Sequence, residues 1–150
     1  MEIKEHIDSA FNNAISQLLR SDAELLFLDI NERSISHRLA IYLEPYFNDW
    51  NVDCEYNRNH DNKKQLDIQP RNIKSDDTQA TTVFPDIIIH KRGTDENLVV
   101  IEMKKTSSSE KDSYDLHKLK AFKKQLGYQF AIFLKLATKG QAGIDLVEWL

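Results

Sequence analysis

Two runs of sequence decide the fold of this chain: Phe84-Pro85-Asp86-Ile87-Ile88-Ile89-His90 and Leu98-Val99-Val100-Ile101-Glu102-Met103-Lys104-Lys105. Both runs are rich in β-branched residues and a polar break over 92–97 separates them, which predicts a β-hairpin. A turn centred near Thr94 places Ile88 opposite Val100, His90 opposite Leu98, and Asp86 opposite Glu102.

One face of this hairpin is predicted to carry Asp86, Glu102 and Lys104, because side chains alternate along a strand. Facing residues have Cβ atoms about 4.5–5.5 Å apart, and like charges there destabilise the pair. Two facing carboxylates therefore indicate a positive charge between them. Mg²⁺ fits, because it prefers oxygen ligands and is commonly held by one or two carboxylates. The alternative is a surface salt bridge to Lys104 at a strand end.

The pair Pro85-Asp86, followed by a strand and then by Glu102-Met103-Lys104, resembles the PD-(D/E)xK nuclease superfamily of restriction-endonuclease-like and Holliday-junction-resolvase-like proteins. The resemblance implies an α/β fold with a restriction-endonuclease-like αβββαβ core, a central mixed sheet flanked by helices, here with an extra N-terminal helix. It implies that Asp86 and Glu102 bind Mg²⁺, with Mn²⁺ as a substitute, and that the Met103 carbonyl adds a ligand. Lys104 would orient the attacking water or stabilise charge on the phosphate.

Apolar residues at helical spacing predict helices over 3–19 and 32–47. Glu32 lies within about 20° of Leu39 around the helix axis, so its carboxylate points toward the core. In the superfamily, an acidic residue on the first core helix often joins the metal site, and Glu32 resembles that catalytic position. The alternative is a capping box over 29–32, in which Glu32 only reaches back to the helix start.

The remaining segments are predicted to complete a single domain of 150 residues. Strands are expected over 51–57, where Cys54 is a small buried hydrophobe, over 130–136, and at a sheet edge over 144–149. The polar stretch 58–82 is expected to be a loop insertion that either folds over a substrate or is a plain insertion. A helix is expected over 112–126, with Gly127 just beyond its end, Asp115 capping its first turn and Lys118 pointing away from its apolar stripe.

Charge is unevenly distributed along the chain. The formal net charge is −4, yet residues 103–139 hold nine lysines against three acidic residues. A local cluster of this kind can contact phosphates although the whole chain is acidic. We expect Lys105, Lys118 and Arg38 to bind nucleic acid. For most of these lysines individually, a solvated helix face is the simpler interpretation.

Several classes of function are disfavoured. A single cysteine allows no internal disulfide and no thiolate metal cage, and the five histidines show no zinc-ligand spacing. There is no Gly-x-Ser-x-Gly elbow for a serine hydrolase. We expect His90 to pack against Leu98. No apolar run is long enough for a membrane span and the N-terminus lacks a secretory pattern, which favours a cytoplasmic location without membrane partners.

Two functions are consistent with this sequence. The first is a Mg²⁺-dependent nuclease that cleaves DNA rather than RNA. The resemblance also implies that such a nuclease could act as a homodimer, in which each subunit cuts one strand. The alternative is a catalytically inactive nuclease-fold module that serves as an accessory subunit or as a nucleic-acid or protein interaction module. The intact set of Asp86, Glu102 and Lys104 favours the nuclease.

Overall fold

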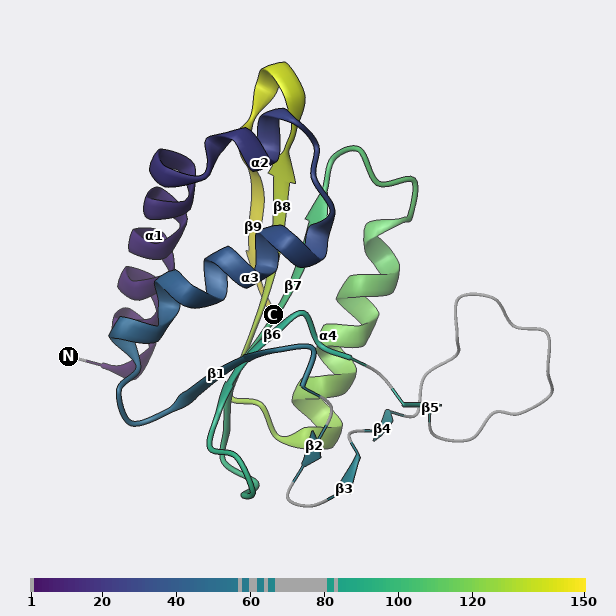
Figure 1. Cartoon of the computed structure of the whole chain (residues 1–150). Helices are drawn as coiled ribbons and strands as arrows, with labels where there is room; N and C mark the ends of the chain where they lie inside the picture. Colours follow the sequence, from purple (N-terminus) through teal and green to yellow (C-terminus); the bar gives the residue numbers. More distant parts are fainter. Residues whose placement is uncertain (1, 57, 60–61, 64, 67–80, 83) are drawn as a thin grey trace, which may run out of the picture.

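The computed structural model describes residues 2–56, 58–59, 62–63, 65–66, 81–82 and 84–150. Its main feature is a five-stranded mixed sheet flanked by helices, which confirms the predicted α/β class (Figure 1). β7 and β8 run parallel, whereas the other neighbouring pairs run antiparallel. In spatial order the strands are β1 (Asn51–Cys54), β6 (Ile87–His90), β7 (Asn97–Lys105), β8 (Phe130–Ala137) and β9 (Gly143–Trp149).

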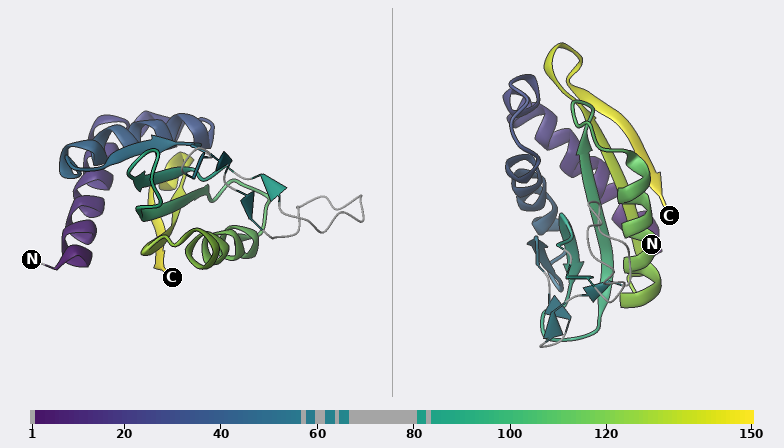
Figure 2. Two further views of the ribbon diagram at one scale, coloured as in Figure 1. Left: turned by 90° about the horizontal axis from the view of Figure 1, so that it is seen from below. Right: turned by 90° about the vertical axis from the view of Figure 1, so that its right-hand side faces the viewer.

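Helices cover both faces of the sheet (Figure 2). One buried cluster joins α1 (Ile3–Ser21) and α3 (Glu32–Leu43) to one face, and a second joins α4 (Asp112–Leu126) to the other. The parallel pair β7 and β8 is connected through α4, as parallel strands require a crossover. The short helix α2 (Ala23–Phe27) links α1 to α3 and was not predicted, because its five residues are too few to show a helical period.

The predicted helix ends are partly confirmed. α4 has the predicted bounds, and Gly127 follows it with φ +71°, the left-handed conformation typical of a residue just past a helix end. The second predicted helix is shorter than 32–47. It ends as an α-helix at Leu43 and continues as a single 3₁₀ turn, η1 (Glu44–Tyr46), because Pro45 has no backbone N–H to extend the α-helix.

β6 and β7 form the predicted hairpin, and Ile88 faces Val100 as expected. The predicted pairing of His90 with Leu98 is wrong, because a register shift at the end of β6 places His90 opposite Asn97. This shift lies at the turn end of the hairpin. At the start of β6, Ile87 pairs with Ile101, as the predicted register requires.

His90 makes polar and aromatic contacts at the turn end of the hairpin. Its Nε2 lies 2.7 Å from a carboxylate oxygen of Asp53, and its ring meets that of Tyr56 edge-on, with the centroids 4.7 Å apart. Arg92 Nε donates to the same Asp53 oxygen at 2.8 Å. These contacts tie β1 to β6.

β7 is buried on both faces, and its side chains alternate between the two cores. Met103 packs in the cluster on the α1 and α3 side, whereas Val100 packs in the cluster beneath α4. Because Glu102 and Lys104 alternate with Met103, their side chains lie on the α4 side of the sheet. The strand pattern therefore directs both charged groups toward α4.

The predicted loop insertion over 58–82 falls mostly outside the described residues. Within it, β2 (Arg58–Asn59) pairs with β3 (Asn62–Lys63), and β4 (Gln65–Leu66) pairs with β5 (Thr81–Thr82). The predicted strand over 51–57 is shorter in the structure and ends at Cys54, whereas β9 lies at the sheet edge as expected. No helix in the described ranges has both the length and the hydropathy that crossing a membrane requires.

Candidate active site

A cavity of ≈ 240 Å³ lies where β6 begins, between the first turns of α3, the end of β7 and α4. The four residues predicted to be catalytic all line it: Asp86, Glu102, Lys104 and Glu32. Six carboxyl groups and three cationic side chains contribute to its lining, so the cavity has a formal excess of three negative charges. Such an excess favours binding of a cation.

Asp86 and Glu102 both line the cavity, and the pairing of Ile87 with Ile101 places them at facing positions of the hairpin. Glu102 is 1% exposed. Burial raises the pKa of both carboxyls, and the charge of Asp86 raises the pKa of Glu102 further. Two facing carboxyl groups, one half-buried and one fully buried, cannot both ionise at low cost, so this pair is stabilised either by a proton or by a cation.

The Met103 backbone borders the same pair. Its N–H donates to Asp86 Oδ2 at 2.8 Å. The N–H and C=O of one strand residue point to the same neighbouring strand, so the Met103 carbonyl is directed to the side of β7 where Asp86 lies. The predicted third ligand is therefore on the correct side of the strand.

Glu32 lines the cavity from the first position of α3. The helix is capped by Asn31, whose side chain accepts from Ser34 N at 2.8 Å. The alternative of a capping box over 29–32 is therefore wrong. Burial, and next the charges of Asp86 and Asp115, raise the pKa of Glu32, which reflects its position among other acids.

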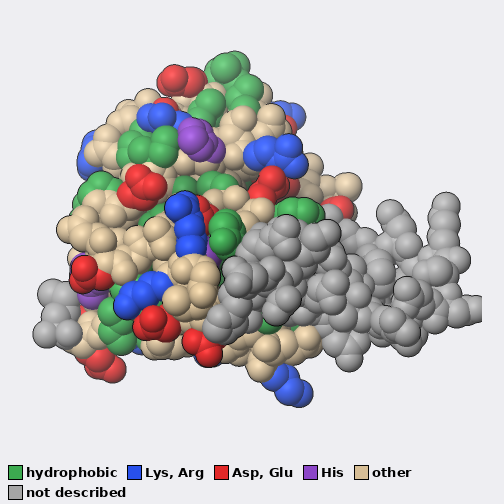
Figure 3. All heavy atoms as spheres, turned by 60° about the horizontal axis from the view of Figure 1, so that its bottom comes forward, with side chains coloured by type: hydrophobic (Ala, Val, Ile, Leu, Met, Phe, Trp, Pro, Cys, Tyr) green, Lys and Arg blue, Asp and Glu red, His purple; other side chains and the backbone are tan. Residues whose placement is uncertain are grey.

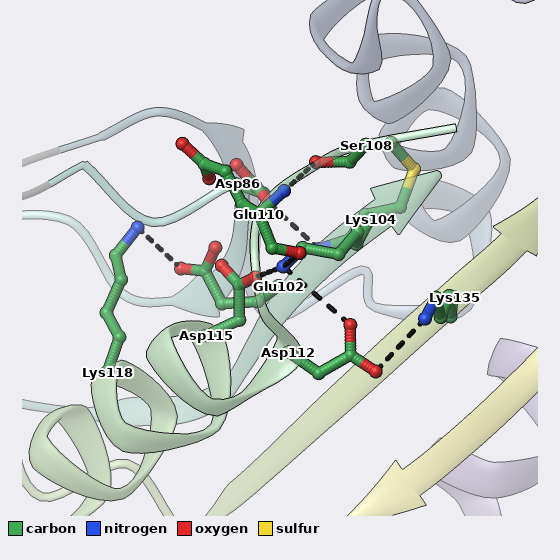
Figure 4. A network of polar contacts seen from close by, with 10 residues as sticks. Asp86, Glu102, Lys104, Ser108, Glu110, Asp112, Asp115, Lys118 and Lys135 are labelled. Carbon is green, nitrogen blue, oxygen red and sulfur yellow. Dashed lines mark hydrogen bonds and ion pairs between the residues drawn. The ribbon is translucent and has the colours of Figure 1, made fainter. Parts of the chain in front are cut away.

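Lys118 reaches the carboxyl pair from α4 (Figure 4). Its ammonium lies 3.0 Å from Glu102 Oε1 and donates to the Phe84 carbonyl at 2.8 Å. The prediction that Lys118 points away from the buried stripe is wrong, since only 8% of the residue is exposed. Its own position on α4 explains this: Lys118 lies four residues before Phe122 and so shares a face with that buried ring.

Lys104 enters the cavity but contacts different acids. Its ammonium lies 2.7 Å from Asp115 Oδ2 and 3.7 Å from Asp112 Oδ1, and it donates to the Glu110 carbonyl at 3.0 Å (Figure 4). Asp112 also pairs with Lys135 at 3.1 Å. Lys104 therefore links β7 to the start of α4.

Asp115 was not predicted as a site residue, but as a cap of the first turn. The structure places it 4% exposed at the cavity, with Lys104 as its partner. The sequence contained a signal. Phe122 follows it by seven residues and so lies within about 20° of it around the helix axis, which puts a carboxylate on the apolar stripe. The same reasoning identified Glu32.

Two residues predicted to bind nucleic acid do not line this cavity. Lys105 pairs with Asp29 Oδ1 at 3.1 Å, and Arg38 donates to Asp22 Oδ2 at 3.1 Å and to the Tyr42 hydroxyl at 2.8 Å. Their role in binding nucleic acid stays a prediction. On the described part of the face in Figure 3, basic and acidic side chains are interspersed rather than gathered by sign.

Cys54 also lines the cavity and is half-buried. Burial, with the nearby charge of Asp86, raises its pKa to about 11. Its thiol donates to the Ser36 carbonyl at 3.6 Å. The side chain therefore stays a neutral thiol near pH 7 and is unsuited to be a nucleophile.

The oxygen donors of the cavity suit a cation that keeps part of its water shell. Within the described ranges, no three His, Cys, Asp or Glu side chains are grouped so as to hold a metal ion by themselves. Mg²⁺ does not need such a cage, because it keeps several waters and commonly binds through one or two carboxylates. The Asp86 and Glu102 pair, with the Met103 carbonyl, is of that kind.

No protein-family model, no curated protein and no solved structure matches this chain. The function is therefore argued from the chemistry of the cavity itself.

Proposed function

We propose that this protein is a Mg²⁺-dependent nuclease of the PD-(D/E)xK type that hydrolyses phosphodiester bonds of DNA. One observation carries the proposal: two carboxyl groups, from Asp86 before β6 and Glu102 on β7, line one cavity with excess negative charge at facing positions of the hairpin. The ion pair between Glu102 and Lys118 balances only one of these two acids. Two adjoining acids are better explained by a divalent cation that they bind together.

The order of elements supports the proposal. Along the chain, α3, β1, β6, β7, α4 and β8 follow one another in the order helix–strand–strand–strand–helix–strand, which the resemblance leads one to expect. β6 and β7 bring the aspartate and the glutamate together, and α4 follows directly. α1, α2, β9 and the long stretch between β1 and β6 are additions to that order.

Asp86 and Glu102, with the Met103 carbonyl, are the groups that would hold Mg²⁺, or Mn²⁺ in its place. The bound ion would polarise a phosphoryl oxygen and lower the pKa of a water. Glu32, with its raised pKa, is suited to hold or accept a proton of the attacking water. Arg33 at the cavity mouth has a side chain that is 78% exposed, so it can reach a phosphate of the DNA strand.

The direct experiment is incubation of the protein with plasmid and single-stranded DNA in Mg²⁺ or Mn²⁺. We expect wild-type protein to cleave, and Asp86→Asn and Glu102→Gln to lose at least about 100-fold in rate. Asp145→Asn, at an exposed position on β9, is the matched control and should cleave normally. An inert wild type, or equal cleavage by Asp86→Asn, would refute the proposal.

One observation favours the inactive module as a second candidate. The Lys118 ammonium lies 3.0 Å from Glu102 and can balance its charge. If this ion pair is permanent, the cavity is a structural feature of an interaction module. Calorimetric titration with Mn²⁺ separates the two candidates, because the nuclease requires binding that Glu102→Gln weakens, whereas the inactive module predicts no binding.

A further inference from the structure

The two lysines of the cavity differ in what their ammonium groups touch. Lys118 contacts Glu102 and the Phe84 carbonyl, two residues before Asp86. Lys104 contacts neither of the two proposed metal ligands. Figure 4 shows Lys118 extending from α4 to Glu102, while Lys104 extends toward Asp112 and Asp115. The sequence pattern had given the catalytic role to Lys104.

Lys104 is held by contacts that suit a structural role. The Lys104 ammonium has two acceptors within hydrogen-bonding distance, Asp115 at 2.7 Å and the Glu110 carbonyl at 3.0 Å, and a longer ion pair with Asp112 at 3.7 Å. Its side chain is 3% exposed. To contact a phosphate beside the carboxyl pair, this ammonium would have to leave the buried Asp115 carboxylate, which is unfavourable.

Lys118 is held in a different place, beside the carboxyl pair. Its two acceptors are Glu102 at 3.0 Å and the Phe84 carbonyl at 2.8 Å. Its side chain is 10% exposed and lines the cavity. The Phe84 carbonyl keeps the ammonium beside the carboxyl pair even when Glu102 is engaged by a cation.

We propose that Lys118, rather than Lys104, is the lysine that contacts the scissile phosphate in this cavity, and that Asp115 holds Lys104 as a structural ammonium. This inference rests on the proposed nuclease function. In hydrolysis, the water oxygen forms a bond to phosphorus and loses a proton, while the bond to the leaving oxygen breaks and that oxygen gains a proton. Lys118 donates a hydrogen bond to the phosphate oxygen on which negative charge develops. Lys118 itself stays protonated throughout.

Single-turnover cleavage at saturating Mg²⁺ tests the assignment. We expect Lys118→Met, shown to be folded by circular dichroism at the assay temperature, to lose about 100-fold in rate. Lys104→Arg, which keeps the charge for Asp115, should stay within about tenfold of wild type. Lys120→Met, at an exposed position on the same helix, is the control. A Lys118→Met variant that cleaves at the wild-type rate, or a folded Lys104→Arg variant that is weaker than Lys118→Met, overturns the proposal.

Mn²⁺ titration by calorimetry at pH 8 gives a second readout that does not depend on cleavage. Removal of the ammonium beside Glu102 should strengthen Mn²⁺ binding by about tenfold in Lys118→Met, because the ammonium competes with the ion for that carboxylate. Lys104→Arg should bind Mn²⁺ as wild type does. Equal affinities in Lys118→Met and wild type would contradict the inference. A wild type that neither binds Mn²⁺ nor cleaves DNA would instead contradict the proposed function.

Discussion

The ammonium of Lys104 lies 2.7 Å from a carboxylate oxygen of Asp115, and both side chains are buried. This ion pair joins the end of β7 to the first turns of α4. It thereby sets the distance between the strand that carries Glu102 and the helix that carries Lys118.

Replacement of Asp115 should destabilise the protein strongly. Asp115→Asn leaves the Lys104 ammonium buried without its closest charge partner, and we expect a loss of about 3 kcal/mol in the free energy of unfolding. Urea unfolding followed by circular dichroism measures this. Asp112→Asn is the matched control. The Asp112 side chain is 32% exposed and 3.7 Å from Lys104, so its replacement should cost less than about 1 kcal/mol. Equal losses in the two variants would contradict the assignment.

The metal-free protein should become less stable as pH rises above 4.5, the ordinary pKa of a glutamate. The pKa of Glu102 is raised well above 4.5, first by burial and then by Asp86. The folded state therefore binds its proton more tightly than the unfolded state does, and the free energy of unfolding falls as pH rises from about 4.5 toward the folded pKa. The pKa of Lys118 is also raised, but from 10.5, so it acts only at higher pH.

Urea titrations between pH 5 and pH 8, with chelator present, measure this slope. Glu102→Gln removes the titrating group and should flatten it. Excess Mg²⁺ should restore stability at pH 8, because an ion that binds only the folded state stabilises it. An unchanged slope in Glu102→Gln would show that other groups control the pH dependence.

Glu32 should lower the stability of the protein but increase its activity. Burial and the charges of Asp86 and Asp115 raise its pKa, so the ionised carboxylate is unfavourable in the metal-free fold. Glu32→Gln removes that charge and should raise the free energy of unfolding by up to about 1 kcal/mol, while it lowers the rate of DNA cleavage. Thermal melts and cleavage assays on the same preparation test both effects. Glu24→Gln, exposed on α2, should change neither, and a loss of stability in Glu32→Gln would contradict the expectation.

Asp53 should control the acid stability of the hairpin end. Burial acts to raise its pKa, but hydrogen bonds from Arg92 and His90 outweigh burial and hold it well below the ordinary value of 3.8. The stability that it contributes is present above pH 3.8 and is lost as pH falls toward the folded pKa. Asp53→Asn should cost about 2 kcal/mol at pH 7 and shift acid unfolding to higher pH. Glu96→Gln, whose side chain is 53% exposed in its pair with Lys91, is the control, and a matching shift in it would count against Asp53.

Local periodicity predicted most of the elements. The alternation in the hairpin placed Ile88 opposite Val100, and helical spacing gave the bounds of α4. The same methods failed at His90, because a shift of one residue near a turn leaves no mark on the apolar pattern. They also missed α2, which is too short for a period to appear.

The sequence predicted part of the candidate site, and the tertiary structure decided the rest. The sequence alone determined that Asp86 and Glu102 face each other, because strand alternation and turn length are local properties. It also directed Glu32 inward, since helical spacing shows which face of α3 is buried. Only the tertiary structure decided which lysine meets the carboxyl pair. A lysine side chain is long, and its partner depends on how α4 is packed across β7. Residue spacing within either element does not contain that information.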